Sequence, residues 1–163
     1  MSKINRILYL DYDGCLHHEQ VFFHPRHGIY MNTPGRSLFE WMPILDELLR
    51  PHPDVSIVLS TSWVRAKNFS FARKQLSPAL RERVIGATFH SRFMHNEAFA
   101  RLPRGVQIED DVARRAPQSW LAIDDDAMGW PDWCRNNLVQ TDGNCGISDP
   151  AVQDAIRKML GSF

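Results

Sequence analysis

The stretch Ile7-Leu8-Tyr9-Leu10-Asp11-Tyr12-Asp13-Gly14 begins as a continuous apolar run and ends at two acidic residues and a glycine. A short apolar run of this kind is typical of a strand buried in a parallel sheet. In open α/β sheets, ligands bind just beyond the carboxyl ends of the strands, which is where Asp11 lies. Because side chains alternate along an extended chain, Asp11 and Asp13 are expected to point the same way, and Gly14 allows a sharp turn. The stretch therefore predicts two carboxylates that converge on one small volume.

Two like charges held this close are costly unless a cation neutralises them or one carboxyl keeps its proton. A hard divalent ion such as Mg2+ prefers oxygen ligands from one or two carboxylates together with phosphate oxygens. A carboxylate at the same place can also attack phosphorus and form an aspartyl-phosphate. An acidic turn on the surface is the alternative interpretation of the same residues, so the pair has to be weighed together with the rest of the chain.

This first stretch resembles the first motif of the haloacid dehalogenase (HAD) superfamily, an apolar strand that ends in Asp-x-Asp-Gly. The second motif of that superfamily is an apolar strand that ends in Ser or Thr, and Val55-Ser56-Ile57-Val58-Leu59-Ser60-Thr61 is similar to it. Ser60 is the best match, with Thr61 as the alternative. The resemblance implies that this hydroxyl donates a hydrogen bond to a phosphoryl oxygen; a loop hydroxyl that caps the next helix is the other interpretation.

The third motif of the superfamily places a cation near the start of a helix. Arg104 in Pro103-Arg104-Gly105 fits this motif best, and Arg101 is the nearest alternative. Relatives more often have Lys here, but the guanidinium of an arginine makes planar, bidentate contacts with phosphate where an ammonium is a point charge. The resemblance therefore implies that Arg104 binds the phosphoryl group.

The fourth motif is a strand that ends in paired acids, and Trp120-Leu121-Ala122-Ile123-Asp124-Asp125-Asp126 matches it closely. Three acids at a strand end repel one another unless they share a cation. In relatives with an Asp-Asp pair the second acid contacts the metal, so Asp125 is the preferred ligand and Asp124 an orienting or water-mediated partner. Asp126 is expected to be solvated or to cap a helix.

Together the four motifs imply a phosphatase that depends on Mg2+. Asp11 is the expected nucleophile, and Asp13 is the expected acid and base that protonates the leaving oxygen and later activates water. The metal is expected at Asp11, at the main-chain carbonyl of Asp13 and at Asp125, with Asp124 beside it. Ser60, or Thr61 in its place, and Arg104 are expected to bind the phosphoryl group.

Strand and helix patterns alternate along the chain and predict one α/β domain over residues 1–163, with a doubly wound, mostly parallel sheet of the Rossmann-like type. Residues 15–35 suit a small β-hairpin flap, and neither insertion point of the superfamily has room for a cap domain. Residues 37–40 read as a capping box that opens a helix up to residue 49. The other helices are expected over 69–83 with a break near Pro78, over 104–115 and over 150–160, and the later strands over 55–60, 84–89, 120–124 and 137–140.

Composition suits a compact enzyme, with 163 residues, 44% of them hydrophobic, and a formal net charge of zero. No apolar stretch is long enough to span a membrane and no signal-peptide profile is present, so the cytosol is the expected location. The three cysteines, Cys15, Cys134 and Cys145, are expected as reduced thiols. Between Thr61 and Trp120 the chain has eleven Lys or Arg residues against five Asp or Glu residues, which suits a polyanionic substrate.

Capless relatives often act on macromolecules, and the chain looks like the small HAD domains found with RNA-repair enzymes and polynucleotide kinases. A phosphate at the end of a nucleic acid is therefore the first expected substrate, with no membrane partner and with the oligomeric state left open. A phosphoprotein or a small phosphometabolite is the alternative substrate. A different class is a binding domain that keeps the fold without catalysis, but Asp11 and Asp13 are both present, which argues against it. Dehalogenation is disfavoured because relatives with that chemistry lack the second acid.

Overall fold

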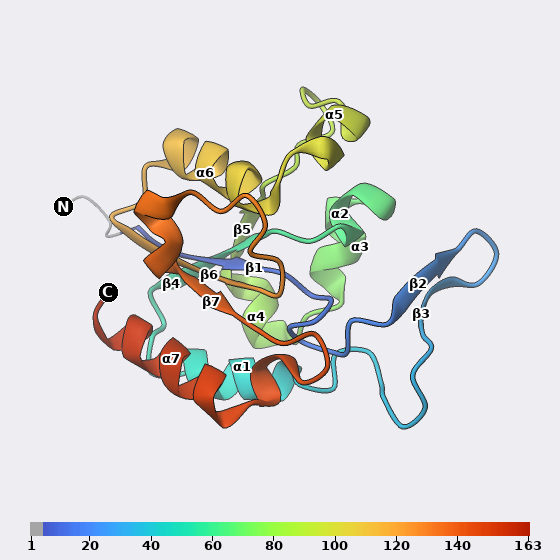
Figure 1. The fold of residues 1–163 in the computed structure, drawn as a ribbon, viewed down its shortest axis with the longest axis horizontal. Helices are drawn as coiled ribbons and strands as arrows, with labels where there is room; N and C mark the ends of the chain where they lie inside the picture. The colour runs from blue at the N-terminus through green and yellow to red at the C-terminus, as the bar shows by residue number, and fades with distance from the viewer. Residues whose placement is uncertain (1–4) are drawn as a thin grey trace.

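The computed structural model describes residues 5–163, which fold around a five-stranded sheet (Figure 1). The strands are β1 (Arg6–Leu10), β4 (Val55–Leu59), β5 (Val84–Ala87), β6 (Ser119–Asp124) and β7 (Leu138–Gln140). Their order is β5-β4-β1-β6-β7, and each neighbouring pair is parallel. Since the chain adds strands first on one side of β1 and then on the other, this is the doubly wound arrangement that the sequence predicts.

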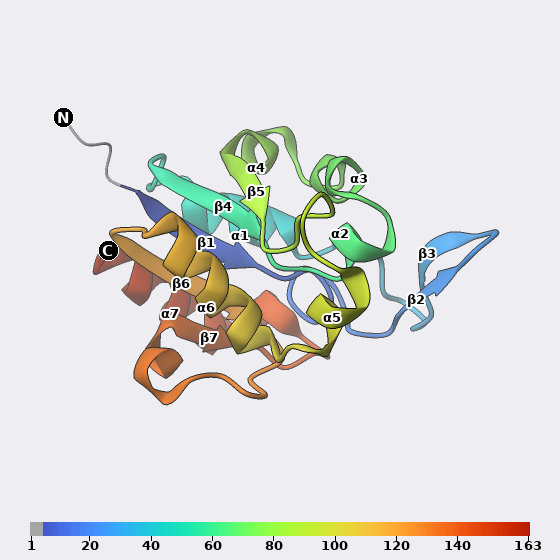
Figure 2. The same cartoon turned by 90° about the horizontal axis from the view of Figure 1, so that it is seen from above.

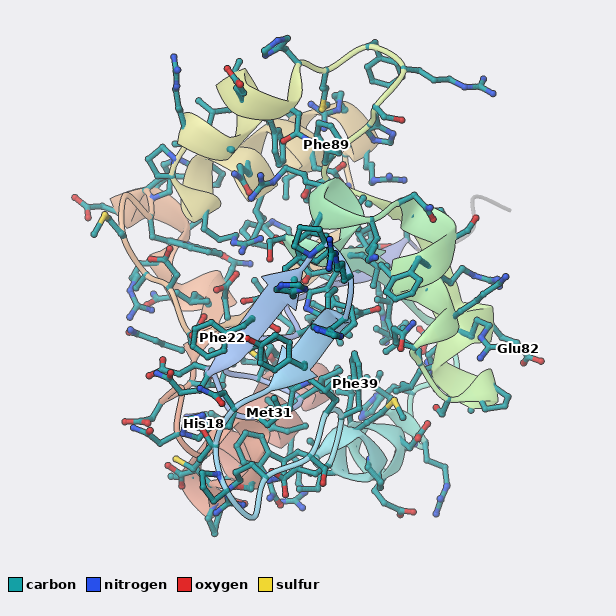
Figure 3. All side chains as sticks on the ribbon, turned by 90° about the vertical axis from the view of Figure 1, so that its right-hand side faces the viewer. His18, Phe22, Met31, Phe39, Glu82 and Phe89 are labelled. Atoms are coloured by element: carbon teal, nitrogen blue, oxygen red, sulfur yellow. The ribbon has the colours of Figure 1, made fainter. Side chains whose placement is uncertain are left out.

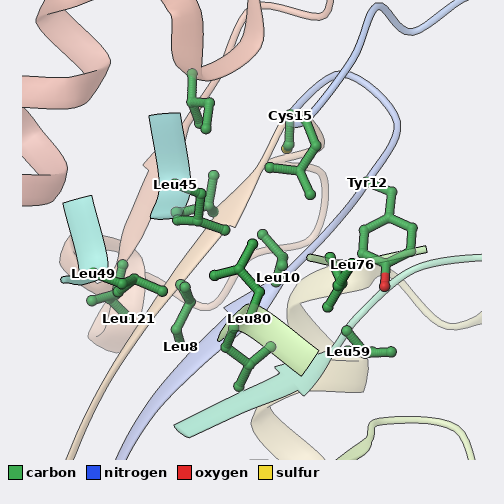
Figure 4. Packing of buried hydrophobic residues seen from close by; sticks show 14 of the residues in the cluster. Leu8, Leu10, Tyr12, Cys15, Leu45, Leu49, Leu59, Leu76, Leu80 and Leu121 are labelled. Carbon is green, nitrogen blue, oxygen red and sulfur yellow. The ribbon is translucent and has the colours of Figure 1, made fainter. Parts of the chain in front are cut away.

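Helices cover both faces of the sheet, as alternation along β1 requires (Figures 1 and 2). Leu8 and Leu10 point to the face covered by α1 (Met42–Leu49), α4 (Pro78–Arg83) and α7 (Pro150–Gly161). Ile7 and Tyr9 point to the opposite face, under α6 (Arg104–Arg115) and the 3-10 helix η1 (Asp132–Asn137). Figure 4 shows the first of these layers, in which Leu8 and Leu10 lie near side chains of α1. Because both faces are covered, most residues of β1, β4 and β6 are apolar and buried.

The helical region expected over 69–83 is indeed interrupted before Pro78. It consists of α3 (Phe69–Lys74) and α4, and the Ser77 hydroxyl caps α4 by accepting the N–H of Leu80 at 3.3 Å. Proline suits this first turn because its missing N–H would have no helical partner there. Three short helices complete the set: α2 (Trp63–Ala66), α5 (Asn96–Arg101) and η2 (Gly146–Ser148). The strand expected over 84–89 ends earlier, at Ala87.

The capping box predicted at residues 37–40 is wrong. Helix α1 begins at Met42, after Trp41, and no side chain caps its N-terminus. The chain leaves the helical path because Phe39 has a positive φ of 59° and donates its N–H to Nδ1 of His17 at 3.1 Å. A contact with a residue 22 positions earlier therefore decides the local conformation that the sequence pattern assigned to a helix start.

The predicted hairpin flap is present as β2 (Val21–His24) and β3 (Gly28–Met31), which pair antiparallel and project from the end of the molecule where β1 terminates (Figure 1). Its base is held by His18, whose Nε2 lies 3.0 Å from Oδ1 of Asn144. No cap domain covers the carboxyl edge of the sheet within residues 5–163. None of the helices in this range is long and apolar enough to cross a membrane.

Candidate active site

The register of the sheet brings three of the predicted motifs together. Leu10 of β1 pairs with Leu59 of β4 on one side and with Ile123 of β6 on the other. The backbone pairing continues one step further, since the residue after Leu59 donates its N–H to Leu10 at 2.8 Å. The next residues along the three strands, which therefore lie side by side, are Asp11, Ser60 and Asp124.

Three carboxylates meet at this edge. One oxygen from each of Asp11, Asp124 and Asp125 lies within 4.8 Å of the others, and the first two side chains are buried. Burial raises the pKa of Asp11 well above its usual value, and the charge of Asp124 raises it further. Burial also raises the pKa of Asp124 to about 6 and that of Asp125 to about 7. The folded protein thus holds three acids that resist ionising together.

The carboxylate of Asp124 offers a direct test of whether a metal fits. Its Oδ1 accepts the N–H of Asp126 at 3.0 Å, but its buried Oδ2 has no hydrogen-bond partner among the described residues. Nε of Arg104 lies 3.3 Å from that oxygen without the geometry of a hydrogen bond. A buried carboxylate oxygen without a donor is costly, and a cation coordinated by the cluster removes that cost. The donor set, all oxygen and acidic, suits Mg2+.

Gly14 lets the backbone approach this cluster. It has a φ of +76°, and a Cβ at this position would lie only 2.2 Å from Oδ2 of Asp125. Thr141, which follows β7, also holds this loop: its hydroxyl donates a hydrogen bond to the carbonyl of Gly14 at 2.7 Å. Thr141 belongs to none of the four motifs, although its position after the carboxyl end of a parallel strand is a signal in the sequence that points to it.

Arg104 is the cation that the structure brings to the site. It is the first residue of α6, and its Nη1 donates to the Ser60 hydroxyl at 3.3 Å and to the Ser60 carbonyl. Its Nη2 lies 3.9 Å from Oδ1 of Asp11. Burial lowers the pKa of Arg104, but Asp11 and Asp124 outweigh that effect and raise it, so the guanidinium stays charged. The alternative, Arg101, is exposed at the end of α5.

The two hydroxyl candidates after β4 are both buried but have different partners. Ser60 accepts from Arg104, as described above, so it belongs to the same group of atoms as the acidic cluster. The Thr61 hydroxyl accepts the N–H of Trp63 at 3.3 Å, at the start of α2. Thr61 therefore makes the helix-start contact that was the other interpretation of this loop.

The side chain of Asp13 does not join the acidic cluster. Its Oδ1 accepts from Nε2 of His17 at 2.8 Å and from the indole N–H of Trp63 at 2.9 Å. Since Nδ1 of His17 accepts the N–H of Phe39, the ring proton is on Nε2 and His17 is the donor to Asp13. His17 is fully buried, whereas the side chain of Asp13 is 30% exposed. The role of His17 has no sequence signal beyond its place four residues after Asp13.

Comparison with known families agrees with this geometry. The model of one family, described as the HAD domain in Swiss Army Knife RNA repair proteins, matches residues 7–152. That span begins in β1 and ends in α7, so it contains every strand of the sheet and all four motifs. The searches of curated proteins and of solved structures found no match. From the family match over most of its length, together with the order of its motifs, the chain belongs to the family of HAD domains in Swiss Army Knife RNA repair proteins.

Proposed function

We propose that the chain is a Mg2+-dependent phosphomonoester hydrolase that works through an aspartyl-phosphate on Asp11. Membership of a HAD family implies a phosphatase-type hydrolase. The observation that carries the finer proposal is the convergence of three carboxylates with Arg104 and Ser60 at one edge of the sheet. An acidic cluster beside a partly buried arginine and a hydroxyl can bind both a divalent cation and a phosphoryl group.

The metal would be held by the side chains of Asp11, Asp124 and Asp125 and by the main-chain carbonyl of Asp13. The Oδ2 of Asp124, which accepts no hydrogen bond among the described residues, supports including Asp124 as a direct ligand, whereas the resemblance gave it only an orienting or water-mediated role. When bound, Mg2+ supplies positive charge that lets the carboxylates ionise together and polarises the phosphoryl oxygens.

Asp11 is the proposed nucleophile. Its Oδ1 accepts the N–H of Tyr12 at 2.8 Å, so the carboxylate is held in one orientation at the end of β1. In the first step a carboxylate oxygen of Asp11 bonds to phosphorus while the bond to the leaving oxygen breaks. Arg104 and the Ser60 hydroxyl bind the phosphoryl oxygens as charge develops on them.

Asp13 is the proposed acid and base. With both His17 and Trp63 on Oδ1, the other oxygen, Oδ2, is the one available to carry the transferred proton. Asp13 gives this proton to the leaving oxygen in the first step. In the second step it takes a proton from water, whose oxygen bonds to phosphorus and releases Asp11 and inorganic phosphate.

A phosphate at the end of a nucleic acid is the proposed substrate. The family is described by its occurrence in RNA repair proteins, and the site has a small hairpin rather than a cap above it. A site without a cap suits a substrate too large to be enclosed. A phosphate on a macromolecule therefore fits this edge better than a small metabolite does.

The experiment is phosphate release from a panel of substrates: oligonucleotides with a 3′ or a 5′ phosphate, a phosphopeptide and sugar phosphates, each with Mg2+ or with EDTA. We expect release from the oligonucleotides that EDTA abolishes. Asp11→Asn should lower kcat at least about 10³-fold, and Asp13→Asn about 10²–10⁴-fold. Asp126→Asn, an exposed acid beside the cluster, is the matched control and should keep full activity. Full activity of Asp11→Asn would refute the assignment of Asp11 as the nucleophile.

A further inference from the structure

A groove of about 710 Å3 lies beside the candidate active site. One wall comes from residues 64–69, which begin on α2, and the other from residues 85–96, which run from β5 to the start of α5. The first wall begins one residue after Trp63, whose side chain holds Asp13. Figure 2 shows α2 and α5 at the same end of the sheet, and Figure 3 shows Phe89 between them. The volume falls in the range of ligand sites, about 300–1,000 Å3.

The lining of the groove is basic. Arg65, Lys67 and Arg92 belong to it, and among the residues that the structure describes no Asp or Glu does. Burial lowers the pKa of Arg65, and the positive charge of Arg104 lowers it further. Arg65 in the groove is therefore close enough to the phosphate site for its charge to interact with that of Arg104. A concave surface with cations and without carboxylates attracts a polyanion.

The groove also presents aromatic rings. Phe93 is 71% exposed and stacks on the imidazole of His90, with ring centroids 5.0 Å apart and an angle of 20° between the planes. Phe69, on the opposite wall, is also exposed. A ring held flat with one face open to solvent is the platform on which nucleic-acid bases stack, and such stacking accepts any base.

The hairpin flap reaches the same edge. The ammonium of Lys67 lies 5.0 Å from the ring centre of Phe23 on β2, which is itself half exposed. The flap therefore touches the end of α2 rather than standing apart from the groove. An extended chain that leaves the site along residues 64–69 would pass beside the flap.

We propose that this groove binds the last nucleotides of a single-stranded nucleic acid, with its backbone phosphates beside Arg65, Lys67 and Arg92 and a base stacked on Phe93. The inference rests on the proposed function, because it puts the terminal phosphate of that strand at Asp11. A phosphopeptide would use the cations but not the stacked pair of Phe93 and His90, and a duplex keeps its base faces covered. A single strand uses both features of the groove.

The first test is fluorescence anisotropy with labelled single-stranded oligoribonucleotides and oligodeoxyribonucleotides that carry no terminal phosphate. We expect the wild-type protein to bind them, and a duplex of the same sequence to bind more weakly. Phe93→Ala should weaken binding about tenfold or more. Trp133→Ala is the matched control, since Trp133 is 67% exposed on η1, outside the groove, and should bind like the wild type.

The second test is the salt dependence of the same binding. Arg92→Ala should reduce the slope of log affinity against log salt by roughly 0.7, the value for one phosphate contact with a single strand. A 4-thiouridine oligonucleotide should cross-link to residues 89–96, which mass spectrometry maps without any variant. Unchanged affinity of both variants, cross-links outside the two walls of the groove, or tighter binding of a phosphopeptide than of the oligonucleotides would overturn the proposal.

These measurements separate this inference from the proposed function, because an oligonucleotide without a terminal phosphate binds without being hydrolysed. If the protein releases phosphate from an aryl phosphate but binds no single strand, the proposed chemistry stands and the proposal for the groove is refuted. If the protein binds single strands through Phe93 but hydrolyses no phosphate ester, the proposal for the groove stands and the proposed function is refuted.

Discussion

The indole N–H of Trp63 donates to Oδ1 of Asp13 at 2.9 Å. Trp63 is the first residue of α2, so the segment that follows β4 supplies both Ser60 and the donor that holds the proposed acid. His17 donates to the same oxygen at 2.8 Å. The orientation of Asp13 is therefore fixed from two segments that are 46 residues apart in sequence, and the geometry of the proposed proton transfer depends on both.

Trp63→Phe removes one of these donors while keeping an aromatic ring in a buried position. We expect kcat to fall about 10- to 100-fold with little change in KM, because Asp13 would rotate more freely and lose its alignment with the leaving oxygen. Steady-state kinetics on a phosphorylated oligonucleotide checks this. Trp120→Phe is the matched control, since Trp120 is also buried but packs on Tyr9 under α6. Equal kinetic losses in both variants would show that Trp63 acts only through packing.

Gly14→Ala tests the close approach of the backbone to Asp125. Ala should lose about 1–2 kcal/mol of stability from the left-handed backbone alone, and more because its Cβ would displace the Asp125 carboxylate. Gly28→Ala is the matched control, since Gly28 has nearly the same φ, +74°, and nothing within 4 Å of the added Cβ. Denaturant unfolding with and without Mg2+ checks this. Only Gly14→Ala should lose the stabilisation by Mg2+; loss in both would contradict the contact.

The pH dependence of stability follows from the raised pKa values of the three acids. The folded protein holds protons that the unfolded chain has already released. The contribution of these three carboxyl groups to the stability of the metal-free protein is therefore greatest below about pH 4. It should fall as the pH rises through the pKa values of Asp124, about 6, and Asp125, about 7. The gain in Tm from Mg2+ should grow over the same interval, because the ion binds the ionised carboxylates.

Calorimetry in EDTA and in Mg2+ between about pH 5 and about pH 8 measures both trends. Asp125→Asn removes one titrating group, so its curve in EDTA should be flatter than that of the wild type. A wild-type Tm in EDTA that rises over this interval, with the same slope in Asp125→Asn, would contradict the assignment of the raised pKa to this cluster.

Arg104→Ala should lower kcat about 10²–10³-fold, the usual loss when one donor to a developing oxyanion is removed. Arg104→Lys should recover only part of this loss, because an ammonium cannot reach the Ser60 hydroxyl and the phosphoryl oxygens together. The comparison variant is Arg101→Ala, which changes an exposed arginine three residues earlier and should keep wild-type kinetics. A large loss in Arg101→Ala and none in Arg104→Ala would reverse the choice between the two.

Several features of the fold and site were accessible from the sequence because they depend on local patterns. Apolar runs predicted the strands of the sheet, including the three at whose carboxyl ends Asp11, Ser60 and Asp124 lie, and Pro78 predicted the break between α3 and α4. The capping box failed for the opposite reason. Its residues have the correct local pattern, but the bond from Phe39 to His17 turns the chain away from a helix.

Other features depended on the tertiary structure, because they involve side chains from distant segments. The motif favoured Arg104 and left Arg101 as the alternative; the structure distinguishes them because Arg104 lies against Asp11 and Asp124. The groove beside the site is lined by residues 64–69 and residues 85–96, and no sequence motif predicts that these two segments lie together.

Residues 7–14 show the difference between what local sequence predicts and what tertiary contacts decide. Hydrophobic periodicity and glycine's backbone freedom are local properties, so the residues alone were enough to predict a buried strand that ends in two acids and a glycine. Only the tertiary structure separated the two acids, placing Asp11 in a cluster with Asp124 and Asp125 and turning Asp13 toward His17 and Trp63. Charge repulsion, burial and hydrogen bonding act through space, so a side chain's role is decided by the neighbours that the fold brings to it.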